Sequence, residues 1–316
     1  MGIIQNTLEQ GLIYAIMALG VLITYSILDF PDLSVDGTFP LGAAVSALMI
    51  TRGQSPALAL LCAMAAGALA GGLTGLIHVK LKVRDLFSGI IMMTALYAVN
   101  MHVAAGSLRM GKANVPFFST KKVQYATIFE NNALTDLFPA WLEPYSVLLI
   151  SLLLVILVKV LLDLFLKTRA GYLLRAVGDN ETVVTSLARD KGSVKIMGLM
   201  ISGALVALSG AVLCQQQHTF EVSMGTGAIA MALASVIIGT NLFRRVPFVK
   251  STTAVIIGAI VYKACVAVAI RAGVPASDMK LITALLFLII LAAMILWNLL
   301  QIRDEKRKMA QRAEQS

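Results

Sequence analysis

One stretch decides the fold: KTRAGYLLRAVGDNETVVTSLARDKGSVK, residues Lys167–Lys195. It is polar, it carries six basic residues, and an apolar segment long enough to cross a bilayer lies on each side of it. Short loops that are rich in Lys and Arg lie on the cytoplasmic side of a membrane. The stretch therefore predicts a membrane protein with a cytoplasmic connection near its centre.

The pattern inside this stretch predicts two short helices. The first covers about Tyr172–Val177 and is expected to end at Gly178. The residues that follow offer capping oxygens and a negative charge to the start of a second helix: Asp179, Asn180 and Glu181. The second helix is expected to close at Gly192, with Arg189 and Lys191 in its last turn. A connector does not need a capped helix, so we interpret the stretch as a docking element.

The run Thr168–Asn180 (TRAGYLLRAVGDN) resembles the cytoplasmic coupling segment of permeases of ATP-binding-cassette (ABC) importers. Within that group it is most similar to the branched-chain amino acid and ribose permease superfamily. The helices expected at Lys195–Ala211 and Ala230–Thr240 also resemble this superfamily, and Leu33–Ala43 (LSVDGTFPLGA) resembles its tryptophan/tyrosine-type subgroup.

The resemblance implies a coupling role for one set of residues: Tyr172, Arg175, Ala176, Val177, Gly178, Asp179, Asn180 and Glu181. As partners it implies cytoplasmic ABC ATPase subunits, an extracytoplasmic substrate-binding protein and a second permease copy, in a homodimer. ATP and Mg²⁺ would be bound by the ATPase, and this chain would hold no cofactor. The subgroup implies an amino acid as cargo, with an aromatic one as the narrower expectation.

Composition leads to the same class without the resemblance. The 316 residues are 58% hydrophobic and 14% charged, with a mean hydropathy of +0.84, whereas soluble domains have about 25% charged residues. The net charge of +9 gathers between apolar segments, as topology signals do, so it does not indicate nucleic acid. We expect an all-α polytopic membrane protein.

Nine apolar segments predict eight to ten membrane crossings, because a short segment can be half of a broken helix. They cover about 7–28, 38–51, 56–79, 86–108, 144–166, 195–214, 223–240, 248–270 and 279–300. With the central stretch inside, 17 of the 26 basic residues fall on the cytoplasmic side and seven outside. This bias predicts an outside N-terminus and a cytoplasmic C-terminus. The resemblance implies that the membrane is a bacterial-type plasma (inner) membrane.

The predicted apolar segments and the loops between them divide the chain into regions. The permease domain is expected to cover 1–302, with an extracytoplasmic loop at 109–143 and cytoplasmic coupling helices at 167–194. Residues 303–316 form a charged cytoplasmic tail. The long loop either receives a substrate-binding protein or caps the bundle.

Two polar breaks interrupt the apolar pattern. The first, Asp29–Pro40, is either an exposed turn or an unwound stretch at membrane depth that lines a cavity. The second, Gln215–Glu221, is expected to be a turn on the outer side. Gly37-Thr38 and Gly225-Thr226 each precede a small-residue apolar run, which suggests an inverted repeat with a pathway between the breaks. Asp36 and Glu221 are the pathway residues that we select from the two breaks.

Polar side chains inside apolar segments have two interpretations each. Asn100 and His102 either join helices by hydrogen bonds or line the pathway, and we select Asn100 for the latter. Lys159 can pair with Asp163 one turn later. Lys263 has no partner near it in sequence, so it is either functional or extends toward the side of Arg271.

Three glycines spaced by four residues favour close helix packing within the subunit: Gly67, Gly71 and Gly75. No phosphate-binding loop, metal spacing or hydrolase motif occurs, so the chain is not expected to be an enzyme. Our main hypothesis is the transmembrane permease subunit of an ABC importer. The alternative is an ion-coupled secondary transporter with inverted repeats.

Overall fold

The structure is a computed structural model of the chain, and it describes residues 2–108, 114–115, 126–130, 143–179, 190–243, 248–272 and seven residues between 281 and 292. The helices of the described part are α1 (Ile3–Val21), the π-helical turn η1 (Leu22–Ile27), α2 (Val35–Thr51), α3 (Pro56–Leu81), α4 (Asp85–Leu108), α5 (Ser146–Leu166), α6 (Arg169–Asp179), α8 (Lys191–Gln217), α9 (Ala228–Leu242) and α10 (Ser251–Arg271). Short elements complete them: the 3₁₀ turns η2 (Glu143–Tyr145) and η3 (Val222–Gly225), and the strands β1 (Asn114–Val115) and β2 (Phe220–Glu221).

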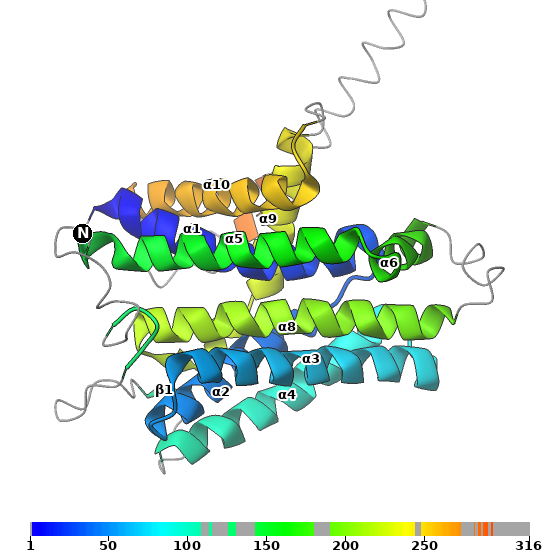
Figure 1. Cartoon of the computed structure of the whole chain (residues 1–316), viewed down its shortest axis with the longest axis horizontal. Coiled ribbons are helices and arrows are strands. Elements are labelled where there is room, and N and C mark those ends of the chain that lie inside the picture. Colours follow the sequence, from blue (N-terminus) through cyan, green and yellow to red (C-terminus); the bar gives the residue numbers. More distant parts are fainter. Residues whose placement is uncertain are drawn as a thin grey trace, which may run out of the picture.

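The molecule is a bundle of long apolar helices. Seven helices of the described chain are long and apolar enough to cross a membrane, and α2 is a shorter apolar helix of 17 residues. Figure 1 shows α1, α5, α8 and α3 running along the same axis, with α6 at one end and the N-terminus at the other. This arrangement confirms the prediction of an all-α polytopic membrane protein. The predicted segment at 279–300 lies almost wholly outside the described residues.

The helices α3 and α8 form the closest pair in the bundle. Gly67, Gly71 and Gly75 all face α8, and a Cβ atom on Gly67 or Gly71 would overlap its backbone. On the α8 side, Gly203 meets the carbonyl of Gly67 in the same way. The spacing of four residues thus places the three glycines along one seam, where the absence of side chains lets the two backbones touch.

The first polar break is shorter than the sequence suggests. Both interpretations of Asp29–Pro40, an exposed turn or an unwound stretch, are wrong for its second half, because α2 begins at Val35 and contains Pro40. Pro40 lacks an N–H, so the Asp36 carbonyl loses its usual intrahelical donor, and Gly225 packs against that carbonyl instead. The chain is non-helical only from residue 28 to residue 34, directly after the π-helical turn η1.

The second polar break is also shorter than predicted. The helix α8 continues through Gln217 and ends at His218, which has a left-handed backbone (φ 52°). Gln215 is helical and fully buried because its side chain finds partners there: its Oε1 accepts from the Ile128 N–H (3.0 Å) and its Nε2 donates to the Ser46 hydroxyl (3.0 Å). A buried amide that is hydrogen-bonded on both sides need not end a helix.

Candidate functional site

The short helix α6 is amphipathic and lies across one end of the bundle (Figure 1). Its buried face consists of Gly171, Leu174 and Val177, and Leu174 and Val177 are no more than 1% exposed. Its outer face presents Tyr172, 61% exposed, together with exposed Arg175 and Asp179. Residues three or four apart share a helix face. One face of α6 is therefore anchored in the bundle while the other is free to be contacted.

Gly178 anchors α6 rather than ending it. The expectation that the helix stops at Gly178 is wrong, because α6 continues to Asp179. A Cβ atom on Gly178 would overlap the carbonyl oxygen of Ile27, the last residue of η1. The glycine is thus needed for close approach to the π-helical turn. Helix α6 is therefore in direct contact with the point where the first helix breaks.

The predicted C-terminal end of the second short helix, at Gly192, is wrong. Lys191 and Gly192 do not close a helix; they open α8, whose N-cap is Asp190. The carboxylate accepts from the Ser193 hydroxyl (2.7 Å) and from the N–H of Gly192 (3.0 Å). Hydrogen bonds from Ser193 and then from the Gly192 N–H lower the pKa of Asp190 below its ordinary value. Asn180, Glu181 and Arg189 lie outside the described residues.

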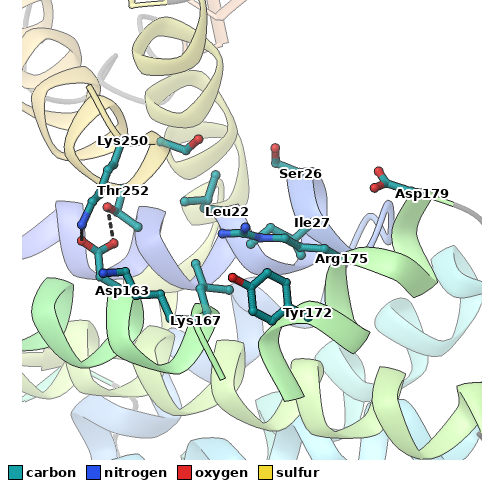
Figure 2. Close-up of a pocket in the computed structure, with 12 residues that line it drawn as sticks. Leu22, Ser26, Ile27, Asp163, Lys167, Tyr172, Arg175, Asp179, Lys250 and Thr252 are labelled. Carbon is teal, nitrogen blue, oxygen red and sulfur yellow. Dashed lines mark hydrogen bonds and ion pairs between the residues drawn. The ribbon is translucent and has the colours of Figure 1, made fainter. Parts of the chain in front are cut away.

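A polar cavity of about 580 Å³ lies beside α6, between η1, the end of α5 and the start of α10. Figure 2 shows Arg175 reaching across it toward Leu22. At its rim, Asp163 accepts from Lys250 Nζ (2.9 Å), from Lys159 Nζ (3.3 Å) and from the Thr252 hydroxyl (2.7 Å). The predicted Lys159–Asp163 pair is confirmed, and Asp163 also joins α5 to α10.

Helices α2 and α9 meet at Asp36, in the first turn of α2. Its carboxylate accepts from the N–H of Gly227 (3.0 Å) and from the N–H of Ile229 (2.8 Å), at the start of α9. Helix α9 has no side-chain cap of its own, so Asp36 supplies one from 191 residues earlier. A carboxylate also complements the positive end of the α9 dipole. The two short segments are therefore joined to one another at their first turns.

Asn100 and Glu221 lie next to this junction. Asn100 is fully buried in α4, and its Nδ2 donates to the carbonyl of Gly37 (2.9 Å). Its Oδ1 has no partner among the described residues, which is uncommon for a buried amide. Glu221, in β2, is exposed and accepts from the Ser223 hydroxyl (3.2 Å). Asp36 and Asn100 thus lie together at the first turn of α2, whereas Glu221 lies in β2, just before η3.

A series of contacts links α6 to α9. Helix α6 contacts the end of η1, the break follows it, and α2 is joined to α9 through Asp36. Within the described ranges, no group of three or more His, Cys or carboxylate residues could hold a metal ion. The seven described helices that are long and apolar enough to cross a membrane define a polytopic membrane protein.

Comparison with known families identifies the class of membrane protein. The profile of the family described as "Branched-chain amino acid transport system / permease component" matches residues 3–299. The chain therefore belongs to this family of permeases.

Individual relatives agree with the family assignment. The chain is 43% identical over 289 residues to the tyrosine transport system permease protein of Clostridioides difficile (strain R20291), covering 92% of this chain and 90% of the relative. It is 28% identical over 240 residues to the ribose import permease protein RbsC of Escherichia coli (strain K12), covering 74% of this chain and 68% of the relative. No solved structure matches the chain.

The family assignment confirms the main hypothesis. The chain is the transmembrane permease subunit of an ABC importer, and it is a transport subunit rather than an enzyme. The family implies ATPase and binding-protein partners and a multi-pass location in the inner membrane. The ion-coupled alternative is not favoured, because the family and these relatives are permease components of transport systems.

Proposed function

We propose that the chain is the permease of an amino acid importer whose cargo is of the aromatic class. The support is the 43% identity to a tyrosine transport system permease over nearly the full length of both chains. The sugar permease relatives are more distant and cover less of the chain. The cargo would be delivered by an extracytoplasmic binding protein, because ABC importers of this family work with one.

We infer that α6 is the helix that receives the ATPase. The observation that carries this proposal is the division of α6 into an anchored face and a free face. Tyr172, Arg175 and Asp179 would touch the ATPase, while Val177 and Gly178 transmit the movement from the buried side. Ala176 lies between the two faces, and Asn180 and Glu181 would extend the contact. ATP and Mg²⁺ would be held by the ATPase, with no cofactor in this chain.

The contacts of α6 suggest how the movement reaches the pathway. A push on α6 would act through Gly178 on Ile27 and on the non-helical residues that follow it. The short helix α2 begins after these residues and carries Asp36, which holds α9. Asp36, Asn100 and Glu221 would border the route of the solute where these helices meet. Alternate exposure of that region to the two sides would then move the solute.

The same proposal includes an oligomeric state and a membrane topology. Two copies of the chain would form the pathway as a homodimer. The N-terminus and the loop at 109–143 would be extracytoplasmic, and the coupling helices at 167–194 and the tail at 303–316 would be cytoplasmic, as the distribution of basic residues predicts. The Asp163 contacts would then lie near the cytoplasmic end, where they hold α5 and α10 together.

The docking proposal is tested by charge reversal on the free face of α6. The tagged chain is purified from its native membrane in mild detergent, and the co-purified ATPase is quantified for the wild type, Arg175→Glu and the control Arg52→Glu. Arg52 is exposed at the opposite end of the bundle, between α2 and α3. We expect Arg175→Glu to lower ATPase recovery at least about tenfold, because a reversed charge in an interface costs several kcal/mol. Equal recovery with both variants would contradict a docking role for α6.

The cargo proposal needs a transport assay. Uptake of labelled tyrosine is measured in cells that carry the complete system, with unlabelled phenylalanine, leucine and ribose as competitors. We expect competition by phenylalanine but not by ribose, and loss of uptake when ATP is depleted while ion gradients are kept. Competition by ribose alone would reject the aromatic cargo and leave the ABC assignment intact.

A further inference from the structure

A second cavity, of about 250 Å³, lies between α1 and α10 at the end of the bundle opposite α6. Helix α1 lines it with the amides of Asn6 and Gln10, and α10 lines it with Lys263 and Arg271. Figure 1 shows the two helices side by side at the edge of the molecule, with the N-terminus nearby. None of these residues belongs to the site proposed above.

Lys263 is the unusual member of this lining. It is only 9% exposed, and it makes no hydrogen bond or ion pair with any residue that the structure describes. Its ammonium lies 3.7 Å from the centre of the Tyr14 ring, whose face attracts a cation. Glu9, a buried carboxylate on α1, accepts from Gln5 Nε2 (2.9 Å) and does not line the cavity. A cation held inside a membrane bundle usually has a specific partner.

The Lys263 side chain extends into the bundle rather than toward Arg271. Gly11 of α1 packs against Ile260 of α10, and Tyr14 lies further along α1 from this contact. The ring beneath the ammonium is therefore on the far side of Lys263 from Arg271, as expected when helical side chains tilt toward the helix N-terminus. Extension of the ammonium toward the nearer end of the helix, one of the two interpretations of the sequence, is wrong.

The depth of Lys263 in the bundle determines which ligands can reach its ammonium group. Eight residues separate it from Arg271, which corresponds to about 12 Å along the helix. The phosphate of a lipid lies near the helix end, at the level of Arg271, whereas a small solute can enter between the polar side chains of α1. The described lining has two cations, carboxamides and no carboxylate. It therefore suits an anionic oxygen group.

We propose that this cavity binds a small solute through one anionic oxygen group, a carboxylate or a phosphate. Arg271, which is exposed at the entrance, attracts the anion from water. Lys263 binds it at the floor, and the amides of Asn6 and Gln10 donate hydrogen bonds from the side. The proposal does not depend on the cargo proposed above, because it concerns binding to the permease alone.

The test measures binding to the purified full-length chain in neutral detergent, without ATPase or binding protein. Three probes are titrated by calorimetry: 3-phenylpropionate, the matched cation phenethylamine, and inorganic phosphate. We expect at least one of the two anions to bind and the amine not to bind. Lys263→Gln should weaken anion binding at least about tenfold, because it removes a charged hydrogen bond. Arg271→Gln should weaken it only about two- to fivefold, as an exposed charge would.

The control variant is Arg52→Gln, which removes an exposed positive charge at the same end of the bundle and away from the cavity; it should leave binding unchanged. Thermal unfolding of each variant shows whether it is folded. Equal anion binding by the wild type and Lys263→Gln would overturn the proposal, as would absence of binding by both anions. A second titration, with phosphatidylglycerol in place of the solutes, shows whether the bound anionic group comes from a lipid or from a solute. If only the lipid binds, and does so through Lys263, the solute proposal is overturned.

Discussion

Removal of the Asp36 carboxylate should separate the two short segments at the centre of the bundle. In Asp36→Ala the N–H groups of Gly227 and Ile229 lose their acceptor. Each unpaired buried donor costs about 1–3 kcal/mol, and because these two N–H groups are only part-buried, we take about 1–2 kcal/mol for each. The two donors together give a loss of about 2–4 kcal/mol in the free energy of unfolding. Asp36→Asn keeps one acceptor oxygen, so its loss should be about half as large.

The assay is thermal unfolding in mild detergent, followed by uptake in cells with the complete importer. At about 2 °C for each kcal/mol, Asp36→Ala should lower Tm by about 4–8 °C. The control is Asp29→Asn, which removes an exposed carboxylate from the first break at a left-handed position (φ 50°) that asparagine tolerates. A wild-type Tm and wild-type uptake in Asp36→Ala would refute the view that this carboxylate joins the segments.

Three further predictions concern helix contacts. Gly178→Ala should reduce both Tm and ATPase recovery, because its Cβ would overlap the last carbonyl of η1; Gly2→Ala, where nothing lies within 4 Å, is the control in the same two assays. Gly71→Ala should lower stability by about 1–3 kcal/mol through overpacking against the α8 backbone. The neighbouring Gly72→Ala should be tolerated, since its Cβ would meet only a methionine side chain at 3.1 Å. Equal Tm values for Gly71→Ala and Gly72→Ala would contradict the close backbone contact between α3 and α8. The pKa of Asp190 is lowered in the folded state, so its cap stabilises α8 above the ordinary carboxyl pKa and is lost as pH falls through the lowered value. The Tm difference between wild type and Asp190→Ala should therefore vanish at low pH, and a difference that persists would contradict a charged cap.

The long helices could be predicted from the sequence because their signal is local. Apolar segments such as 56–79 and 144–166 correspond closely to α3 and α5, and the glycine spacing already indicated one helix face. The Lys159–Asp163 pair was visible for the same reason, since its members are one turn apart. Each of these features depends only on residues that are near one another in the chain.

Helix ends and long-range partners could not be predicted in this way. A glycine after a helical run is typical of a helix end, but Gly178 instead allows close packing against Ile27, which is distant in sequence. Gln215 is polar, as turn residues are, but it lies inside α8. There its side chain is hydrogen-bonded to the Ser46 hydroxyl and the Ile128 N–H. For Asp36, the sequence indicated a polar break, and only the fold shows that the carboxylate holds the first turn of α9.

The cap that Asp36 supplies has a consequence for biogenesis. The first turn of α9 emerges from the ribosome about 190 residues after the side chain that completes it. Until the N-terminal helices have been inserted and arranged, the N–H groups of this turn lack the Asp36 acceptor, and unpaired N–H groups are unfavourable inside a bilayer. Insertion of the C-terminal half should therefore require the N-terminal half to be already in place. Two fragments divided in the long loop should assemble only when they are produced together, and the C-terminal fragment alone should be degraded.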